Sequence, residues 1–417
     1  MSTEKNWSDT HDFVAGRIHR PATIDAVRRI VAGTSRIHAV GARHSFNGAA
    51  DSPGEIVDLG AIQPDIAIDP ERRIATVGAG TDYAVLGQHL HEAGWALHNM
   101  ASLPHVTVGG AVATGTHGSG DRLGTLSSAV ATLELITATG DLLTLRRGDS
   151  GFDGAVVALG ALGIVTRVGL DIQPAYAMRQ DAYEALPWET LTGDFDAVMG
   201  AGTSVSIFTQ WSTPTAGRLW IKTRLPDGDP GQQPAPPAGT HPAAHPSTAG
   251  TAESLLRLTG FGTPGPWWER LPHMRREFVP HPPEQIQSEY MLPRIQAVAA
   301  IGRMRAMGER IDRHLIVTEI RSMTADTLWL SPAHGHDTVA MHFTWKKDTQ
   351  EVATLTQDIE NALLPLGARP HWGKLIHAPA ARLAPLYPRM DDFRQLVQRL
   401  DPQGKFRNAF LERHVLG

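Results

Sequence analysis

Residues 99–120 read NMASLPHVTVGGAVATGTHGSG, and this stretch carries the strongest signal about the fold. Glycine, alanine and threonine leave it almost without bulky side chains, so its backbone can come within hydrogen-bonding distance of a flat or extended ligand. Val108 and Val112 are interleaved with the small residues, which indicates a packed segment rather than a loose loop. The P-loop pattern G-x-x-x-x-G-K-[ST] is absent, and no G-x-G-x-x-G lies between a strand and a helix, so a nicotinamide site is poorly supported. The stretch therefore favours a cradle for a cofactor of another kind.

Upstream, residues 40–46 read VGARHSF, a predicted strand end that runs into a glycine turn with His44 at its tip. Such a turn presents backbone N–H groups to a phosphate and projects one side chain rigidly. Taken alone, a histidine in a turn is more often a surface residue than a functional one. Its weight comes from its combination with the small-residue stretch that follows.

Four predicted strands downstream, residues 285–290, 315–321, 339–345 and 371–376, each pair an apolar face with a polar one. The polar side chains are Gln287 and Glu289 in the first, Glu319 and Arg321 in the second (with Ile316 and Ile320 opposite), His342 and Thr344 in the third, and Lys374 beside Trp372 and Ile376 in the fourth. A wet face of an antiparallel sheet is the usual explanation for such a pattern. Here, however, each polar residue is a different donor or acceptor type, which suits a ligand with many hydroxyls.

Composition excludes several classes of function. The 417 residues are 19% charged and 41% hydrophobic with a formal net charge of −5, and the basic residues are scattered, so neither nucleic acid nor a membrane is expected as a partner. Cysteine is absent, which excludes disulfides, thiolate nucleophiles and iron–sulfur clusters. The 20 histidines include no H-E-x-x-H, so no metal site is expected. The polar N-terminus and the lack of a long apolar run predict a cytoplasmic protein.

Predicted secondary structure and composition differ between parts of the chain. Residues up to about 174 alternate short strands with a few helices, which predicts a mixed α+β fold rather than a regular βαβ series. Residues 226–252 are dense in proline, glycine and alanine and read as a surface excursion rather than a domain boundary. A helix is expected in the tail, between residues 390 and 415.

Taken in order, G-x-x-H-S-F, N-M-A-S-L-P-H, G-T-H-G-S-G, E-I-R, H-F-T-W, P-H-W-G-K and D-P-x-G-K-F resemble the alditol (xylitol) oxidases of the vanillyl-alcohol oxidase superfamily, covalent FAD flavoproteins. The resemblance spans residues 7–410. It implies a two-domain α+β fold, with an FAD-binding domain formed by residues 1–175 and 377–417. A cap domain with an antiparallel sheet, residues 176–376, would cover the flavin ring.

The resemblance also implies site residues. The histidine that bonds covalently to the flavin matches His44. Further FAD contacts would come from Ala39, Val40, Gly41, Ala42, Arg43, Ser45, Ser102, Thr107, Gly110, Ala111, Val112, Ala113, Gly115, His117, Ile164 and Val165. The polyol would contact Ser102, Gln287, Glu319, Arg321, Thr344 and Lys374, with His342 nearby. Arg43 departs from the family turn, which usually has glycine there; at φ > 0 it would cost about 1 kcal/mol, or it could reach a phosphate or carboxylate.

The implied reaction is oxidation of a terminal primary alcohol of xylitol, sorbitol or a similar polyol by hydride transfer to flavin N5. Oxygen would be reduced to H₂O₂, and the protein would act as a monomer. His342 and Lys374 are both candidates for the base, while Arg321 and Lys374 would stabilise negative charge and Glu319 would orient a hydroxyl. Two alternatives stay open: an aldonolactone oxidase or dehydrogenase of the same superfamily, and a non-catalytic sugar-binding protein.

Overall fold

The computed structural model describes residues 4–226, 235–245, 257–278 and 285–417. The N-terminal part contains these elements: β1 (Arg17–His19), α1 (Ile24–Gly33), β2 (Ile37–Val40), β3 (Glu55–Asp58), β4 (Ile66–Asp69), β5 (Ile74–Gly78), α2 (Tyr83–Glu92), β6 (Trp95–Ala96), α3 (Val108–Ala113), β7 (Val130–Ile136), β8 (Leu142–Arg146), α4 (Phe152–Val156), β9 (Ile164–Asp171) and β10 (Gln173–Pro174). Among them, β1, β3 and β2 form a parallel sheet, and β4, β5, β9, β7 and β8 form an antiparallel one. This mixture agrees with the predicted α+β class.

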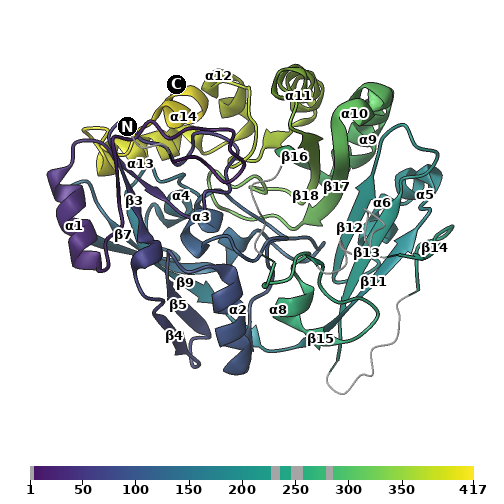
Figure 1. Ribbon diagram of the computed structural model, residues 1–417, viewed down its shortest axis with the longest axis horizontal. Helices are drawn as coiled ribbons and strands as arrows, with labels where there is room; N and C mark the ends of the chain where they lie inside the picture. Colours follow the sequence, from purple (N-terminus) through teal and green to yellow (C-terminus); the bar gives the residue numbers. More distant parts are fainter. Residues whose placement is uncertain (1–3, 227–234, 246–256, 279–284) are drawn as a thin grey trace.

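The middle of the chain builds a larger antiparallel sheet, drawn in teal and green in Figure 1. Its strands are β11 (Ala177–Glu184), β12 (Ser204–Thr209), β13 (Arg218–Arg224), β14 (His241–Pro242), β15 (Gly265–Pro266), β16 (Gln285–Pro293), β17 (Leu315–Met323), β18 (Thr338–Lys346) and β19 (Arg369–Pro370). The accompanying helices are α5 (Trp188–Gly193), α6 (Phe195–Met199), α8 (Trp267–Arg270), α9 (Ala297–Ala306), α10 (Gly308–His314) and α11 (Thr349–Leu363). The sheet order is β14-β11-β13-β12-β17-β18-β16-β19, and β15 pairs with β11.

Hydrophobic side chains gather in two main cores. One core joins the N-terminal sheets to the C-terminal helices α12 (Ala380–Leu383), α13 (Met390–Leu400) and α14 (Ala409–Leu411). The chain end is also tied back by hydrogen bonds, since Ile37 N–H donates to the Lys405 carbonyl at 3.0 Å. The other core lies between one face of the large sheet and helices α5, α6, α9, α10 and α11 (Figure 1). The domain boundaries at residues 175 and 376 stay a prediction. Trp267 and Trp372 lie inside the predicted cap domain but pack in the first core.

Strand register places the polar residues of the large sheet in rows. His342 on β18 lies opposite Glu289 on β16 and opposite Glu319 on β17. Thr344 lies opposite Gln287 in the same way. The alternate residues, including Met341, Phe343 and Trp345 of β18, are buried in the core beneath the helices. The predicted division into apolar and polar faces is therefore correct for these three strands.

Two expectations about these strands are wrong. Ile316 does not share the core face with Ile320, because the register of β17 shifts between Leu315 and Val317, which leaves Ile316 43% exposed. Residues 371–376 form a turn and an irregular segment rather than a strand, with the Lys374 N–H donating to the His371 carbonyl at 2.9 Å. Within the excursion at 226–252, residues 227–234 and 246–252 lie outside the described residues, whereas 241–242 form β14.

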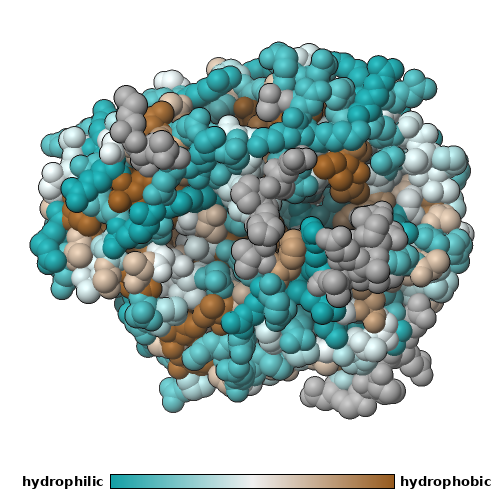
Figure 2. Space-filling model, in the orientation of Figure 1, coloured by the Kyte–Doolittle hydropathy of each residue, from teal (hydrophilic) through white to brown (hydrophobic). Residues whose placement is uncertain are grey.

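The surface is unremarkable in hydropathy. Figure 2 shows mostly hydrophilic side chains on this face, with hydrophobic ones in small separate groups. Among the described residues, the large apolar side chains that are exposed are Val14, Leu142, Ile295, Val298 and Ile316. Isolated apolar side chains of this kind are normal on a protein surface. None of the described helices combines the length and apolar character that crossing a bilayer requires.

Candidate active site

A cavity of about 820 Å³ is lined by residues from both parts of the chain. One wall comes from the N-terminal part and consists largely of small residues, among them Gly41, Ala42, Gly109 and Gly110. The opposite wall is the polar face of β16, β17 and β18, supplemented by the segment that carries Lys374. The cavity is within the size range of small-molecule and cofactor sites.

Most of the residues expected to contact a cofactor line this cavity. They are Ala39, Val40, Gly41, Ala42, Arg43, His44, Ser45, Ser102, Thr107, Gly110, Ala111, Ala113, His117 and Val165. Val112, Gly115 and Ile164 do not line it. Val112 and Ile164 are buried in the N-terminal core, and Gly115 (φ +65°) turns the chain against Pro332.

Close packing explains the glycines of the small-residue wall. A Cβ on Gly41 would overlap Oγ1 of Thr107, and one on Gly109 would come within 2.8 Å of the Ala79 Cβ. Glycine at 41 therefore lets this turn pack against the Thr107 side chain, and glycine at 109 lets its segment pack against Ala79. The hydroxyl of Thr107 is buried and has no hydrogen-bond partner in the described structure. A buried polar group without a partner is costly, so this hydroxyl is available to a bound ligand.

The turn that carries His44 has the left-handed conformation suspected at Arg43, whose φ is +62°. The guanidinium does not need a phosphate as its partner, because it lies 2.7 Å from a Glu4 carboxylate oxygen and 3.1 Å from one of Asp58. The indole of Trp7 packs 4.5 Å from the His44 ring, centroid to centroid. Burial, with Lys374 and His105 nearby, lowers the pKa of His44 to about 4, so its ring is neutral near pH 7.

Arg321 is the centre of the polar wall. Its guanidinium donates to Glu289 at 2.6 Å and to the Ser102 hydroxyl at 3.3 Å, and its Nε lies 3.7 Å from Glu319. Burial alone would raise the pKa of both carboxyl groups, but Arg321 and neighbouring histidines hold each pKa well below its ordinary value. Both carboxylates are therefore charged, and the three groups form a paired network that is almost completely buried.

Gln287 connects the two candidate bases. Its Oε1 accepts from Nζ of Lys374 and from Nε2 of His342, the latter at 3.1 Å. Burial lowers the pKa of Lys374 to about 8 and that of His342 to about 3. His342 is consequently neutral near pH 7 with its proton on Nε2, while a substantial fraction of Lys374 is the free amine at mildly alkaline pH.

The loop of Lys374 is fastened to the turn of His44. The amide of Asn47 donates to the carbonyls of Trp372 and Lys374 at 2.9 and 2.6 Å. The Phe46 N–H donates to the Gly373 carbonyl at 2.8 Å, and the Lys374 ammonium lies 4.9 Å from the centre of the Phe46 ring. These contacts set the position of the lysine relative to the histidine although 330 residues of sequence separate them.

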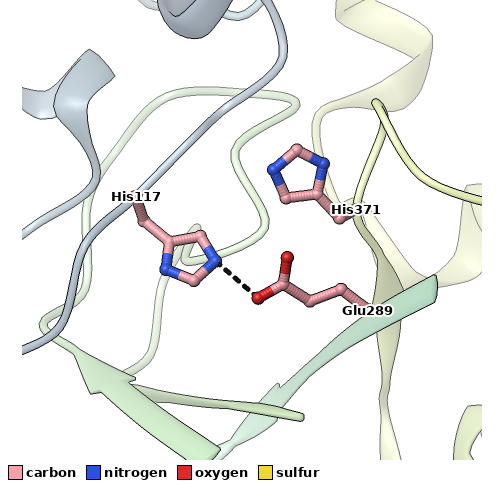
Figure 3. Close-up of side chains that lie close together, drawn as sticks. All are labelled: His117, Glu289 and His371. Atoms are coloured by element: carbon pink, nitrogen blue, oxygen red, sulfur yellow. Dashed lines mark ion pairs between the residues drawn. The ribbon is translucent and has the colours of Figure 1, made fainter. Parts of the chain in front are cut away.

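His117, Glu289 and His371 form a close cluster that the sequence does not predict (Figure 3). Three potential ligand atoms, one from each residue, lie within 4.8 Å of one another, and His117 Nε2 is 3.1 Å from Glu289 Oε1. A divalent cation would meet two obstacles. Arg321 already pairs with this carboxylate, and the Gly373 N–H donates to Nδ1 of His371, which leaves the ring proton on Nε2. Glu289 is therefore paired with Arg321, and neither ring nitrogen of His371 is free to bind a metal.

Sequence reasoning placed Glu289 on the polar face of its strand but gave it no role in the site, and it missed His371 and His273. Glu289 carried a usable signal, since it shares the β16 face with Gln287. His371 and His273 carried none, because neither lies in a regular strand and their neighbours show no period. His273 lines the cavity and its Nε2 lies 2.7 Å from Glu319.

Family models match two stretches of the chain. A model described as FAD binding domain matches residues 16–146, and one described as D-arabinono-1,4-lactone oxidase matches residues 279–414. Among solved structures, a cholesterol oxidase from B. sterolicum has a TM-score of 0.80 at 15% identity and covers 99% of this chain and 96% of its own. At that identity the likeness concerns the fold, which consists of an FAD-binding domain and a second domain.

Curated relatives are more specific. An L-gulono-1,4-lactone dehydrogenase of Mycobacterium tuberculosis is 29% identical, with 99% of this chain and 98% of the relative covered. An L-gulonolactone oxidase of Bos taurus is 25% identical, with 98% and 97% covered. An alditol oxidase of a Streptomyces species is 43% identical over 415 residues, which cover 99% of both chains. The chain therefore belongs to the alditol oxidase family, flavin-dependent oxidoreductases of the vanillyl-alcohol oxidase superfamily.

Proposed function

We propose that this protein oxidises the terminal primary alcohol of an alditol such as xylitol or sorbitol to the aldose. FAD attached through His44 would accept the hydride, and O₂ would be the final acceptor and yield H₂O₂. The observation that carries the proposal is the polar wall, where buried groups of opposite charge face the small-residue wall across one cavity. A ligand that offers a hydroxyl to each of these groups binds more tightly than one that leaves any of them without a hydrogen-bond partner.

The residues present fit FAD. Small residues from both 39–45 and 107–113 line the cavity, and the buried Thr107 hydroxyl has no hydrogen-bond partner among the described residues. Bound FAD supplies the hydride acceptor that the chain itself lacks. The neutral ring of His44 has an unprotonated nitrogen, which covalent attachment to the flavin requires, and Trp7 restricts the ring position.

Lys374 is the better candidate for the base. His342 uses its Nε2 proton to donate to Gln287, and burial makes its pKa about 3, so it is a poor proton acceptor and a suitable hydrogen-bond donor. Lys374 has a pKa of about 8. Its amine can therefore both accept and release a proton near neutral pH, as a general base must. We therefore assign removal of the hydroxyl proton to the free amine of Lys374.

Arg321 and Glu319 would orient the substrate. The guanidinium is held by Glu289, so its position does not depend on substrate, and it can stabilise negative charge that develops on the alcohol oxygen. Glu319 is charged and lines the cavity, and its carboxylate can accept a hydrogen bond from a neighbouring hydroxyl. Thr344 on the same wall and Ser102 on the small-residue wall supply hydroxyl groups to the cavity.

The cofactor and its linkage are tested by acid precipitation. A yellow pellet from the wild type and a colourless pellet from His44→Ala are expected, and a yellow supernatant from the wild type would contradict the covalent attachment. The reaction is tested by oxygen uptake with xylitol and sorbitol, with peroxide measured in parallel. A fully loaded yellow protein that oxidises neither polyol would refute the alditol assignment.

Aldonolactone oxidation is the second candidate. The match of residues 279–414 to the lactone oxidase model and the lactone-oxidising relatives favour it. Gulono- and galactonolactones, each assayed with O₂ and with a dye acceptor, distinguish this activity from alditol oxidation and distinguish an oxidase from a dehydrogenase. A cytoplasmic location and a monomeric state also stay predictions, which fractionation and light scattering would test.

A further inference from the structure

We propose that Lys222 and His273 are positioning residues that hold one oxygen of Glu319 and leave the other for a substrate hydroxyl. This inference rests on the proposed function, because it concerns how Glu319 meets its substrate. The two residues come from different elements: Lys222 lies in β13, and His273 follows α8. With Glu319 on β17 they form a continuous chain of side chains that ends at the cavity, in which Lys222 and Glu319 are buried and His273 is 12% exposed.

Lys222 begins the chain, and its side chain is fully buried, which lowers the pKa of its ammonium group to about 7. Its Nζ donates to the Leu271 carbonyl, lies 3.1 Å from the Pro272 carbonyl, and lies 3.1 Å from Nδ1 of His273. An ammonium group has three donors, and each of them has an acceptor here. A hydrophobic side chain of similar volume would avoid the cost of burying this charge, so packing alone does not account for the lysine.

The protonation state of His273 follows from its two neighbours. Because the Glu319 carboxylate can only accept, the ring proton must lie on Nε2, and Nδ1 is the acceptor for Nζ of Lys222. Nε2 is 2.7 Å from Oε1 of Glu319, which completes the chain Lys222 to His273 to Glu319. Burial, with Lys222 close by, lowers the pKa of His273 to about 4, so the ring is neutral near pH 7. Only this tautomer satisfies both contacts.

Two aromatic side chains also restrict the position of the His273 ring. Trp220 packs edge-on at 4.9 Å between ring centroids, and Phe208 lies 5.7 Å away. Phe208 pairs with Glu319 across strands β12 and β17, so ring and carboxylate share one patch of the sheet. The backbone N–H of His273 donates to the Ser102 carbonyl at 3.0 Å, which ties the residue to the small-residue wall. His273 therefore couples the two walls of the cavity.

This arrangement leaves one oxygen of Glu319 for the substrate. The side-chain contacts of Glu319 found among the described residues both run to Oε1, from His273 at 2.7 Å and from Arg321 at 3.7 Å. Without the His273 donor, the carboxylate can rotate toward Arg321 and pair with it directly. Both groups would then be less available to hydroxyls. The expected defect is weaker substrate binding with the chemical step largely retained.

The experiment compares four variants of the FAD-loaded enzyme, with kcat and KM measured separately for xylitol. His273→Phe and Lys222→Met should each raise KM about 10- to 100-fold with kcat within about threefold, which is the scale of one lost hydrogen bond to a charged group. His273→Gln should restore most of the affinity, because its amide can donate to Glu319. The double variant Lys222→Met/His273→Phe should be no worse than His273→Phe, since both act through one carboxylate.

Lys405→Met is the matched control. Lys405 is also buried, and its Nζ donates to the Val31 carbonyl at 2.6 Å, but neither residue lines the cavity. This variant should lose stability without any change in KM. Flavin absorbance and thermal unfolding of every variant separate folding defects from binding defects. If Lys222→Met does not fold, the comparison of KM between His273→Phe and His273→Gln still tests whether position 273 must donate to Glu319.

The proposal is overturned if His273→Phe or folded Lys222→Met keeps the wild-type KM, if Gln at position 273 restores nothing, or if the effects of the two single variants multiply. Failure of the proposed function looks different, because the wild type would then not oxidise xylitol at all. In that case the same variants are compared on whichever lactone the wild type oxidises.

Discussion

Lys374→Met should abolish an alkaline rise in activity. In the wild type, burial sets the pKa of Lys374 at about 8, so about 1% of the amine is free at pH 6 and nearly all of it at pH 10. If the free amine removes the hydroxyl proton, kcat/KM should rise about 100-fold from pH 6 to its plateau above pH 9. The rise should be tenfold per pH unit below the inflection. Methionine at this position removes the base and should lower the plateau by about 10²- to 10⁴-fold.

The assay is oxygen uptake at limiting xylitol across pH 6 to 10, with flavin content checked at each pH. Gln287→Glu serves as the matched variant, because a carboxylate beside Nζ should raise the pKa of Lys374 and move the inflection to higher pH. A wild-type inflection near pH 8 that survives in Lys374→Met would refute the assignment. It would direct attention to Lys222, a buried amine whose pKa burial lowers to about 7, and not to His342, whose pKa is about 3.

Two further predictions concern the small-residue wall. Gly41→Ala should lower the ratio of flavin absorbance to protein absorbance, because its Cβ would overlap the Thr107 hydroxyl, and Thr107→Ala in the same chain should relieve that overlap and restore part of the flavin. If the single variant binds flavin normally, the two segments are not as closely packed as described. Arg43→Ala should reduce the free energy of unfolding in urea by about 1–2 kcal/mol through loss of the contacts with Glu4 and Asp58. Arg43→Gly should cost less because the left-handed strain disappears, and both should keep their flavin, whereas loss of flavin would mean that this guanidinium binds a phosphate.

Much of the polar wall could be predicted from the sequence because strand alternation is a local property. Knowing that Glu319 and Arg321 share a face requires only their spacing in one strand. The register shift that exposes Ile316 could not be predicted, since it depends on how β17 pairs with β18. The turn at residues 371–376 was missed for a similar reason. Its conformation is held by contacts with Asn47 and Phe46 from the other end of the chain.

The sequence by itself determined the small-residue cradle, the histidine at the tip of its turn, and the polar faces of the three strands that cap it. These features depend on residue type and short spacing, which the chain carries locally. Only the tertiary structure decided which polar groups meet. Strand pairing and loop contacts bring distant segments together and so form three hydrogen bonds of the site. These are Arg321 to Glu289, His273 to Glu319, and Lys374 to Gln287. The same contacts decided the protonation of the site, because a pKa depends on burial and on neighbouring charges, neither of which short spacing specifies.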